Sequence, residues 1–123
     1  MEFSGKKAFE LSLLPYFEKM VTGGYKMVMT ILEARVTKEN WVALEQAYQQ
    51  GSQQRDPGLE QSFLIHSSKE ADLWRILTVW SSQEALDKMR NSGKTPLGVL
   101  MFRSANAEPV LSVFQIVQHI APE

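Results

Sequence analysis

The stretch LWRILTVWSSQEALDKMR, residues 73–90, decides the fold of this 123-residue chain. Its first half, residues 73–80, is rich in Leu, Ile, Val and Trp and contains no breaker, so it predicts a β-strand. Ser81 followed three residues later by Glu84 is the pattern of a capping box, which predicts a helix that runs to about Asn91. We therefore expect a strand that leads directly into a helix.

The segments on either side supply the other strands and the other helix. Trp41, Leu44 and Tyr48 recur at helical spacing after Thr37, a good N-cap residue, and the β-branched and apolar runs around them are typical of strands. The further expected elements are a strand over residues 26–36, a helix over 38–53, a strand over 59–67, an irregular segment over 93–109 with a short helical turn near Leu97 to Phe102, and a final strand over 110–120.

This order of elements predicts an α+β fold, the ferredoxin-like βαββαβ plait. In that plait a four-stranded antiparallel sheet carries both helices on one face. We assign residues 26–123 to this domain. Residues 1–25 are predicted to form an N-terminal helical arm, because apolar side chains recur at helical spacing from Phe9 to Met20 and Gly23-Gly24 ends the pattern.

The composition is that of an ordinary globular domain with little net charge. The sequence is 44% hydrophobic and has 13 basic and 14 acidic residues, for a formal net charge of −1, so binding to nucleic acid or to a membrane surface is not favoured. The absence of cysteine excludes thiolate chemistry, and with only His66 and His119 we expect no metal site. Since no apolar run is long enough to span a bilayer and residues 1–25 lack a signal-peptide pattern, we expect a cytoplasmic protein.

Both faces of the predicted sheet are apolar. In the third strand Trp74 and Trp80 point to one face, whereas Leu77 and Val79 point to the other. Two helices on the same side can cover only one face. The sequence therefore predicts a homodimer with twofold symmetry, in which the uncovered sheet faces of two chains pack together.

Short motifs at the strand ends carry a resemblance to a known family. They are Pro57-Gly58-Leu59 before the second strand, Asp72 before the third, the run Trp80-Ser81-Ser82-Gln83-Glu84-Ala85-Leu86, and Pro109-Val110 before the last strand. Over about residues 27–120 this pattern resembles the antibiotic biosynthesis monooxygenase family of the dimeric α/β-barrel superfamily. The resemblance implies a dimeric α/β barrel. That family includes cofactor-independent monooxygenases of aromatic compounds, quinol monooxygenases, heme-degrading enzymes, an isomerase and members without known activity.

The sequence departs from the heme-degrading members at two of three positions. Those members combine an asparagine on the first strand, a tryptophan at the end of the third and an iron-binding histidine on the second helix. Trp80 matches the tryptophan, but Met89 and Arg90 occupy the histidine region and residues 27–36 contain no asparagine. No phosphate-binding loop or dinucleotide fingerprint occurs either. We therefore expect no heme, flavin, nicotinamide or other cofactor.

Four residues are candidates for binding a substrate. The resemblance places Trp80 under the helices, where an indole offers a flat wall and one N–H donor to an aromatic ligand. Trp74 shares its face, Met89 would add adaptable apolar surface, and Tyr48 would add a polar contact. The alternative for each is ordinary core packing.

Two residues are candidates for catalysis. His66, at the end of the second strand, is either a general base or a polar residue at a strand end. Arg75 lies among apolar residues on the face assigned to the dimer. It is either an anchor for a carboxylate or quinone oxygen or one half of a salt bridge with Glu33, within the chain or across the dimer.

Two functions remain open from the sequence. The first is a cofactor-independent monooxygenase acting on a small aromatic substrate of the phenol or quinol type. The second is a non-catalytic dimeric α/β barrel that binds a small apolar ligand or serves as a scaffold. An open cavity between Trp80 and the helices would favour a ligand site, whereas a packed interior would favour the scaffold.

Overall fold

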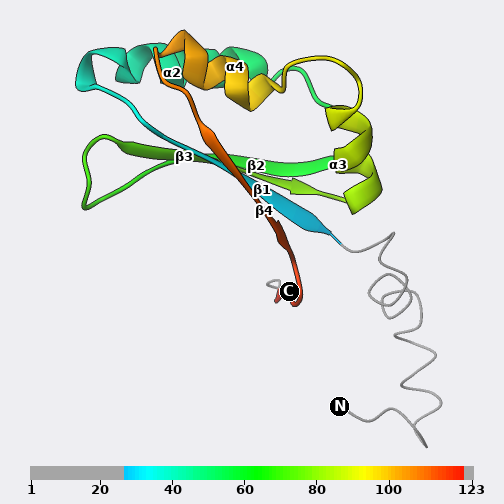
Figure 1. The fold of residues 1–123 in the computed structure, drawn as a ribbon. Coiled ribbons are helices and arrows are strands. Elements are labelled where there is room, and N and C mark those ends of the chain that lie inside the picture. Colours follow the sequence, from blue (N-terminus) through cyan, green and yellow to red (C-terminus); the bar gives the residue numbers. More distant parts are fainter. Residues whose placement is uncertain (1–26, 121–123) are drawn as a thin grey trace, which may run out of the picture.

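The computed structural model describes residues 27–120, in which eight short elements form one layer of helices on one sheet (Figure 1). The predicted arm, residues 1–25, lies outside the described residues. The elements are β1 (Val28–Arg35), the 3₁₀ helix η1 (Lys38–Asn40), α2 (Trp41–Gly51), β2 (Leu59–His66), β3 (Leu73–Trp80), α3 (Gln83–Arg90), α4 (Leu97–Ser104) and β4 (Val110–Gln115).

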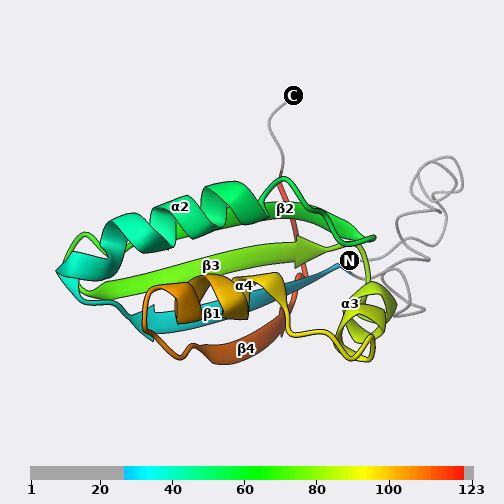
Figure 2. The same cartoon turned by 90° about the horizontal axis from the view of Figure 1, so that it is seen from above.

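The four strands form one antiparallel sheet in the order β2-β3-β1-β4. The helices lie over one face: α2 and α4 run side by side along the sheet, and α3 covers one end (Figure 2). This arrangement confirms the predicted α+β ferredoxin-like fold. Within residues 27–120, no helix is long and apolar enough to cross a bilayer.

Strand register places alternate residues on the two faces of the sheet. Thr30 and Thr78 are opposite each other on β1 and β3, and Thr78 is opposite Ser62 on β2. A β-bulge between Leu59 and Gln61 shifts the alternation at the start of β2. As a result Leu59 and Ser62 both face the helices.

The structure corrects the predicted start of α3. Ser82, not Ser81, is the N-cap residue: its backbone is extended and its Oγ accepts a hydrogen bond from the Ala85 N–H at 3.0 Å. Ser81 instead lies between β3 and α3 and is held to the turn before β2, because its N–H donates to the Gly58 carbonyl at 2.8 Å. The predicted capping box with Glu84 is therefore wrong by one residue.

Two further boundaries differ from the prediction. The segment expected to be irregular contains a full helix, α4, whose Met101 and Phe102 are buried. The last strand ends at Gln115 rather than near Ile120. The apolar run of residues 110–120 reads as one strand, but the ladder with β1 ends at the pair Val28 and Gln115, and beyond it only the Ile116 N–H donates to the Met27 carbonyl, at 3.0 Å, within the described residues.

The helices bury two separate clusters of side chains against the sheet. The larger cluster joins α2 and α4 to the middle of the sheet and includes the fully buried Leu44 and Phe102. The smaller cluster joins α3 to the sheet end through Val28, Trp80 and Leu86. Because α3 stands apart from α2 and α4, the sheet surface between the clusters is not filled by core side chains.

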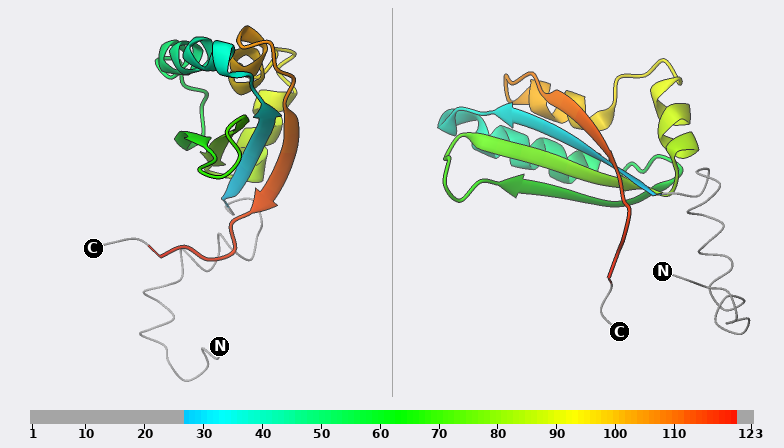
Figure 3. Two further views of the ribbon diagram at one scale, coloured as in Figure 1. Left: turned by 90° about the vertical axis from the view of Figure 1, so that its left-hand side faces the viewer. Right: turned by 60° about the horizontal axis from the view of Figure 1, so that its bottom comes forward.

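The far face of the sheet carries no helix in the described part of the chain (Figure 3). Large apolar side chains are exposed there, among them Phe63 at 48% and Phe114 at 55%. β4, at the sheet edge, is exposed along its whole length. One chain alone therefore leaves an apolar sheet face in contact with water.

Candidate functional site

A cavity of about 690 Å³ lies between the sheet and the helices, at the gap between the two core clusters. Its floor is formed by the sheet, and α3 forms one end. Residues of α2 and α4 line it from above. Leu32, Ile76, Leu86 and Met101 make much of this lining apolar. The volume is typical of a small-molecule site.

The floor of the cavity carries a row of three hydroxyl groups. Thr30, Thr78 and Ser62 are neighbours across β1, β3 and β2, and all three line the cavity. Tyr48 reaches down from α2, and its hydroxyl donates to Ser62 Oγ at 3.0 Å. The row offers hydrogen-bond donors and acceptors to a ligand without placing a charge on the floor.

Trp80 walls the cavity beside this row. Its side chain is only 3% exposed, and its indole N–H donates to Thr30 Oγ1 at 3.1 Å. The flat wall expected from the sequence is present, but the expected free N–H donor is already used. Since Thr30 Oγ1 accepts that bond, its own O–H proton remains free to donate to a ligand.

Of the four predicted substrate-binding residues, three meet at this cavity. Trp80, Tyr48 and Met89 line it. Trp74 does not: it lies six residues before Trp80 on the same strand, about 20 Å away at the usual rise of a strand. Its ring belongs to the larger core cluster.

Trp74 and His66 instead form an aromatic cluster with Trp41 at the other end of the sheet. The His66 and Trp74 rings stack with centroids 3.9 Å apart and planes 9° apart, and Trp41 packs edge-on against both. His66 Nε2 lies 2.6 Å from the Ala71 carbonyl oxygen. His66 is held in this cluster and does not line the cavity. No contact with the cavity therefore supports its predicted role as general base.

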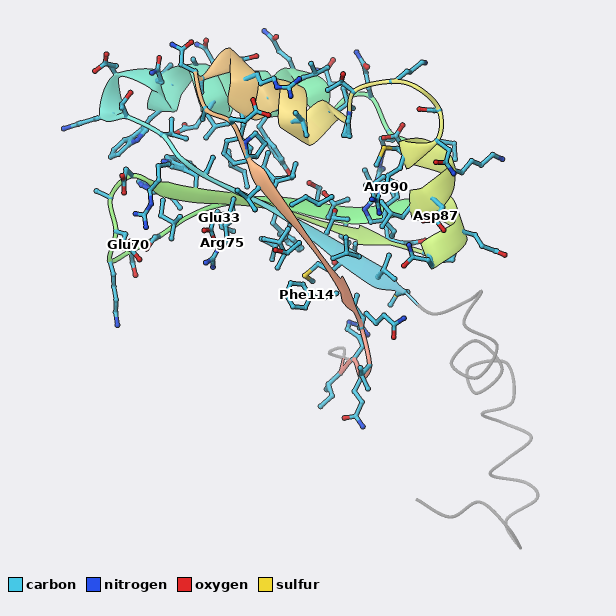
Figure 4. All side chains as sticks on the ribbon, viewed as in Figure 1. Glu33, Glu70, Arg75, Asp87, Arg90 and Phe114 are labelled. Carbon is cyan, nitrogen blue, oxygen red and sulfur yellow. The ribbon has the colours of Figure 1, made fainter. Side chains whose placement is uncertain are left out.

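Arg75 lies on the opposite face of the sheet from the cavity. Its Nε donates to Glu33 Oε1 at 2.6 Å, across the β1–β3 pair (Figure 4). This confirms the ion pair within the chain that the sequence left as one alternative. An anchoring role for Arg75 stays a prediction that concerns the uncovered sheet face, not the cavity.

Charged side chains surround the mouth of the cavity. Arg103 and Glu108 form a bidentate pair, with Nε–Oε1 and Nη2–Oε2 distances of 3.0 and 2.9 Å. The hydrogen bonds from Arg103 hold the pKa of Glu108 below its usual value. Arg90, on α3, and Lys94, on the following loop, also line the cavity.

Sequence reasoning missed Thr30, Ser62, Arg90 and Lys94 as site residues. Thr30 could have been found, because it occupies the helix-covered face of a strand whose other inward residues are apolar. Ser62 could not, because the bulge that turns it inward leaves no signal in the sequence. In residues 27–120 no group of three or more Asp, Glu or His side chains is placed to hold a metal ion.

Together, the fold and the cavity define a small α+β protein with a half-open cavity under its helices. The model of the antibiotic biosynthesis monooxygenase family matches residues 27–95, more than half of the chain. The protein belongs to this family, as the strand-end motifs indicate. A comparison with curated proteins gives no match.

Solved structures from bacteria and an archaeon share the fold at low sequence identity. SnoaB, a cofactor-independent oxygenase from Streptomyces nogalater, is 14% identical, with a TM-score of 0.59 over 80% of this chain and 99% of SnoaB. A possible oxidoreductase from Bacteroides thetaiotaomicron is 19% identical, with a TM-score of 0.55 over 75% of this chain and 99% of that one. A conserved protein from Methanosarcina mazei is 13% identical, with a TM-score of 0.59 over 80% of this chain and 96% of that one. At these identities the likeness concerns the fold.

Proposed function

We propose that the protein is a cofactor-independent monooxygenase that oxidises a small aromatic phenol or quinol with O₂ in the cavity beside Trp80. The observation that carries this proposal is the cavity of about 690 Å³, with an indole wall and a hydroxyl floor, in a chain that belongs to the family. Such a space has the size and mixed lining of a site for an aromatic ring with phenolic oxygens.

The proposed reaction needs no external reductant. A phenol with a ring hydrogen para to its hydroxyl gives two hydrogens and four electrons and becomes a quinone. One oxygen atom of O₂ becomes the new carbonyl oxygen, and the other leaves as water with the two hydrogens. Atoms and electrons balance with substrate and O₂ alone.

The residues of the cavity would bind and orient this substrate. The ring would lie against Trp80, and the apolar walls would keep bulk water away from reactive intermediates. The hydroxyl groups of Thr30 and Thr78 would donate hydrogen bonds to the phenolic oxygen as negative charge develops on it. Neither histidine of the chain lines the cavity, so the proposal assigns the proton to no imidazole.

Oxygen uptake tests the proposal. The purified protein is mixed with naphthols, anthrones and quinols in an oxygen-electrode cell, and substrate-dependent uptake above the spontaneous rate is expected. Thr78→Val should lower the rate by about tenfold, the effect of losing one donor to a developing anion. Thr37→Val, the same substitution on an exposed residue outside the cavity, is the matched control and should keep the wild-type rate.

The rival function makes a different prediction in the same samples. A non-catalytic barrel would bind the aromatic compounds in the cavity, with saturable heat in calorimetry, but would leave O₂ uptake at the spontaneous rate for every compound. That result would overturn the monooxygenase. The absence of both binding and uptake would overturn the cavity as an aromatic site.

We also propose that the chain is a homodimer through the uncovered sheet face. The exposed side chains of Phe63 and Phe114 on that face support this, because one chain alone leaves them in water. Light scattering should give twice the 14.0 kDa mass of one chain. Phe114→Glu should give the single mass, whereas Val42→Glu, at an equally exposed apolar site on α2, should leave the dimer intact.

A cytoplasmic location, without a nucleic-acid or membrane partner, belongs to the same proposal. The near-zero formal net charge of the chain supports the part of this proposal that excludes a nucleic-acid or anionic membrane partner. Fractionation of the source cells should recover the protein with the cytoplasmic enzymes. Recovery with the membrane fraction would contradict it.

A further inference from the structure

We propose that the mouth of the cavity is a carboxylate subsite, formed by Arg90 and Lys94 with Arg55, so that the ligand is an aromatic acid rather than a neutral phenol. This inference rests on the proposed function for the reaction, but as a statement about binding it is tested separately. It specifies the class of ligand: a ring system for the apolar cavity and one carboxylate for its mouth.

Besides the Arg103–Glu108 pair, three cations line the cavity, Arg55, Arg90 and Lys94, together with one further carboxylate, that of Asp56. Within residues 27–120, neither Arg55, Arg90 nor Lys94 has a carboxylate oxygen within 4.0 Å. In Figure 4, Arg90 lies on the inner side of α3, toward the space between the sheet and the other helices. With one carboxylate, Asp56, among three cations that form no ion pair in this part of the chain, the mouth keeps an excess of positive charge.

Arg103 differs from these three cations because it has a carboxylate partner within the protein. Arg103 also lines the cavity, but both of its hydrogen bonds to Glu108 are made within the protein. Its guanidinium is thus occupied, whereas that of Arg90 is available. An available guanidinium offers a planar pair of N–H donors that fits the two oxygens of a carboxylate.

A second, smaller pocket with several polar lining residues adjoins the large cavity. It has a volume of about 200 Å³, and its polar lining residues include Arg55, Asp56, Ser92, Lys94 and Thr95. It shares Arg55, Lys94 and Met89 with the large cavity, so the two spaces adjoin. A ligand with its ring beside Trp80 and Met89 would have its carboxylate where the two spaces adjoin, within the large cavity that Arg55, Arg90 and Lys94 all line.

The solvent exposure of the cations limits how strongly the site should prefer an aromatic acid over its neutral counterpart. Arg55, Arg90 and Lys94 are all exposed, so a bound carboxylate would keep part of its hydration and the attraction would be screened by salt. We expect a preference of about tenfold for the acid over its neutral counterpart at low ionic strength, and a smaller preference in strong salt.

Calorimetry with a matched pair of ligands tests the inference. The probes are 1-hydroxy-2-naphthoate and 1-naphthol, which differ only by the carboxylate, titrated without oxygen so that turnover does not interfere. The wild-type protein should bind the acid about tenfold more tightly. The double variant Arg90→Gln/Lys94→Gln should bind both ligands with nearly the same affinity.

Lys88→Gln is the matched control variant. Lys88 lies on the same helix as Arg90 and is exposed, but lines neither pocket, so its loss should leave the preference unchanged. It removes a charge of the same sign, which controls for the overall field of the protein. If Lys88→Gln lowers the preference as much as the double variant does, the general charge is responsible and the subsite is overturned.

The other outcomes separate this inference from the proposed function. Equal binding of acid and naphthol by the wild-type protein would overturn the subsite, even if oxygen uptake is observed. A tenfold preference that persists in the double variant would also overturn it. A preference that the double variant abolishes would support the subsite, even if no substrate gives oxygen uptake and the monooxygenase proposal fails.

Discussion

Replacing Gly58 with alanine should destabilise the protein by separating α3 from the sheet. Gly58 has a φ of +87°, a conformation that costs a residue with a Cβ about 1–2 kcal/mol. An added Cβ would also overlap the Cβ of Ala85 on α3 and lie 3.2 Å from Ser81 Oγ. Overpacking of this kind typically costs a further ~1–3 kcal/mol. We expect a loss of about 2–5 kcal/mol in the free energy of unfolding.

Gly93 provides the control for the backbone part of this cost. Its φ is +84°, nearly that of Gly58, but an added Cβ there meets no atom within 4 Å. Gly93→Ala should therefore cost only the ~1–2 kcal/mol of the left-handed conformation. The difference between the two variants isolates the close approach of α3 to the start of β2.

Urea denaturation followed by circular dichroism measures both variants. Gly58→Ala should have a lower midpoint than Gly93→Ala with an unchanged slope, since the same surface is exposed on unfolding. Because α3 contributes Leu86 and Met89 to the cavity, Gly58→Ala should also weaken ligand binding. Equal destabilisation by the two substitutions, within about 0.5 kcal/mol, would refute the packing of α3 against Gly58.

Three further substitutions probe the core, the site and the charges. Leu44→Ala, at a fully buried position, should lower the free energy of unfolding by about 3–5 kcal/mol in urea denaturation. Trp80→Phe keeps an aromatic wall but removes the donor to Thr30; it should cost about 1–2 kcal/mol and change the affinity for aromatic ligands measured by calorimetry. Glu108→Gln removes the partner of Arg103. Since the pKa of Glu108 is lowered in the folded state, wild type should be the more stable of the two above the ordinary carboxyl pKa. That advantage should disappear as the pH falls through the lowered pKa of Glu108, as thermal melts across an acid pH series would show.

The strands and their order could be predicted because the sequence signals there are local. Residues 73–80 are mostly apolar and are followed by Ser81-Ser82, and β3 has those bounds in the structure. The sequence predicts only a short helical turn where the structure has α4, because this helix has no side-chain N-cap and begins after Pro96. Its stability comes from the burial of Met101 and Phe102, a tertiary effect that local propensity does not report.

The candidate site could be predicted only where strand alternation is regular. Trp80 is the last residue of β3, a strand with regular alternation. Alternation therefore correctly places Trp80 under the helices and Arg75 on the opposite face. Alternation counted from Leu59 would turn Ser62 outward, and only the bulge reverses this. His66 lies at the end of β2, as expected, but stacks on Trp74 at the other end of the sheet from the cavity, a distance that the sequence pattern does not report.

The origin of the oxygen atom in the product is the most direct test of the central claim. The protein is incubated with a phenol that gives oxygen uptake, under O₂ enriched in the heavy isotope, and the quinone is analysed by mass spectrometry. We predict one heavy oxygen atom in each product molecule, at a rate that Thr78→Val lowers and Thr37→Val does not. A product with no heavy oxygen, or labelling at the same rate without the protein, would contradict the assignment as a monooxygenase.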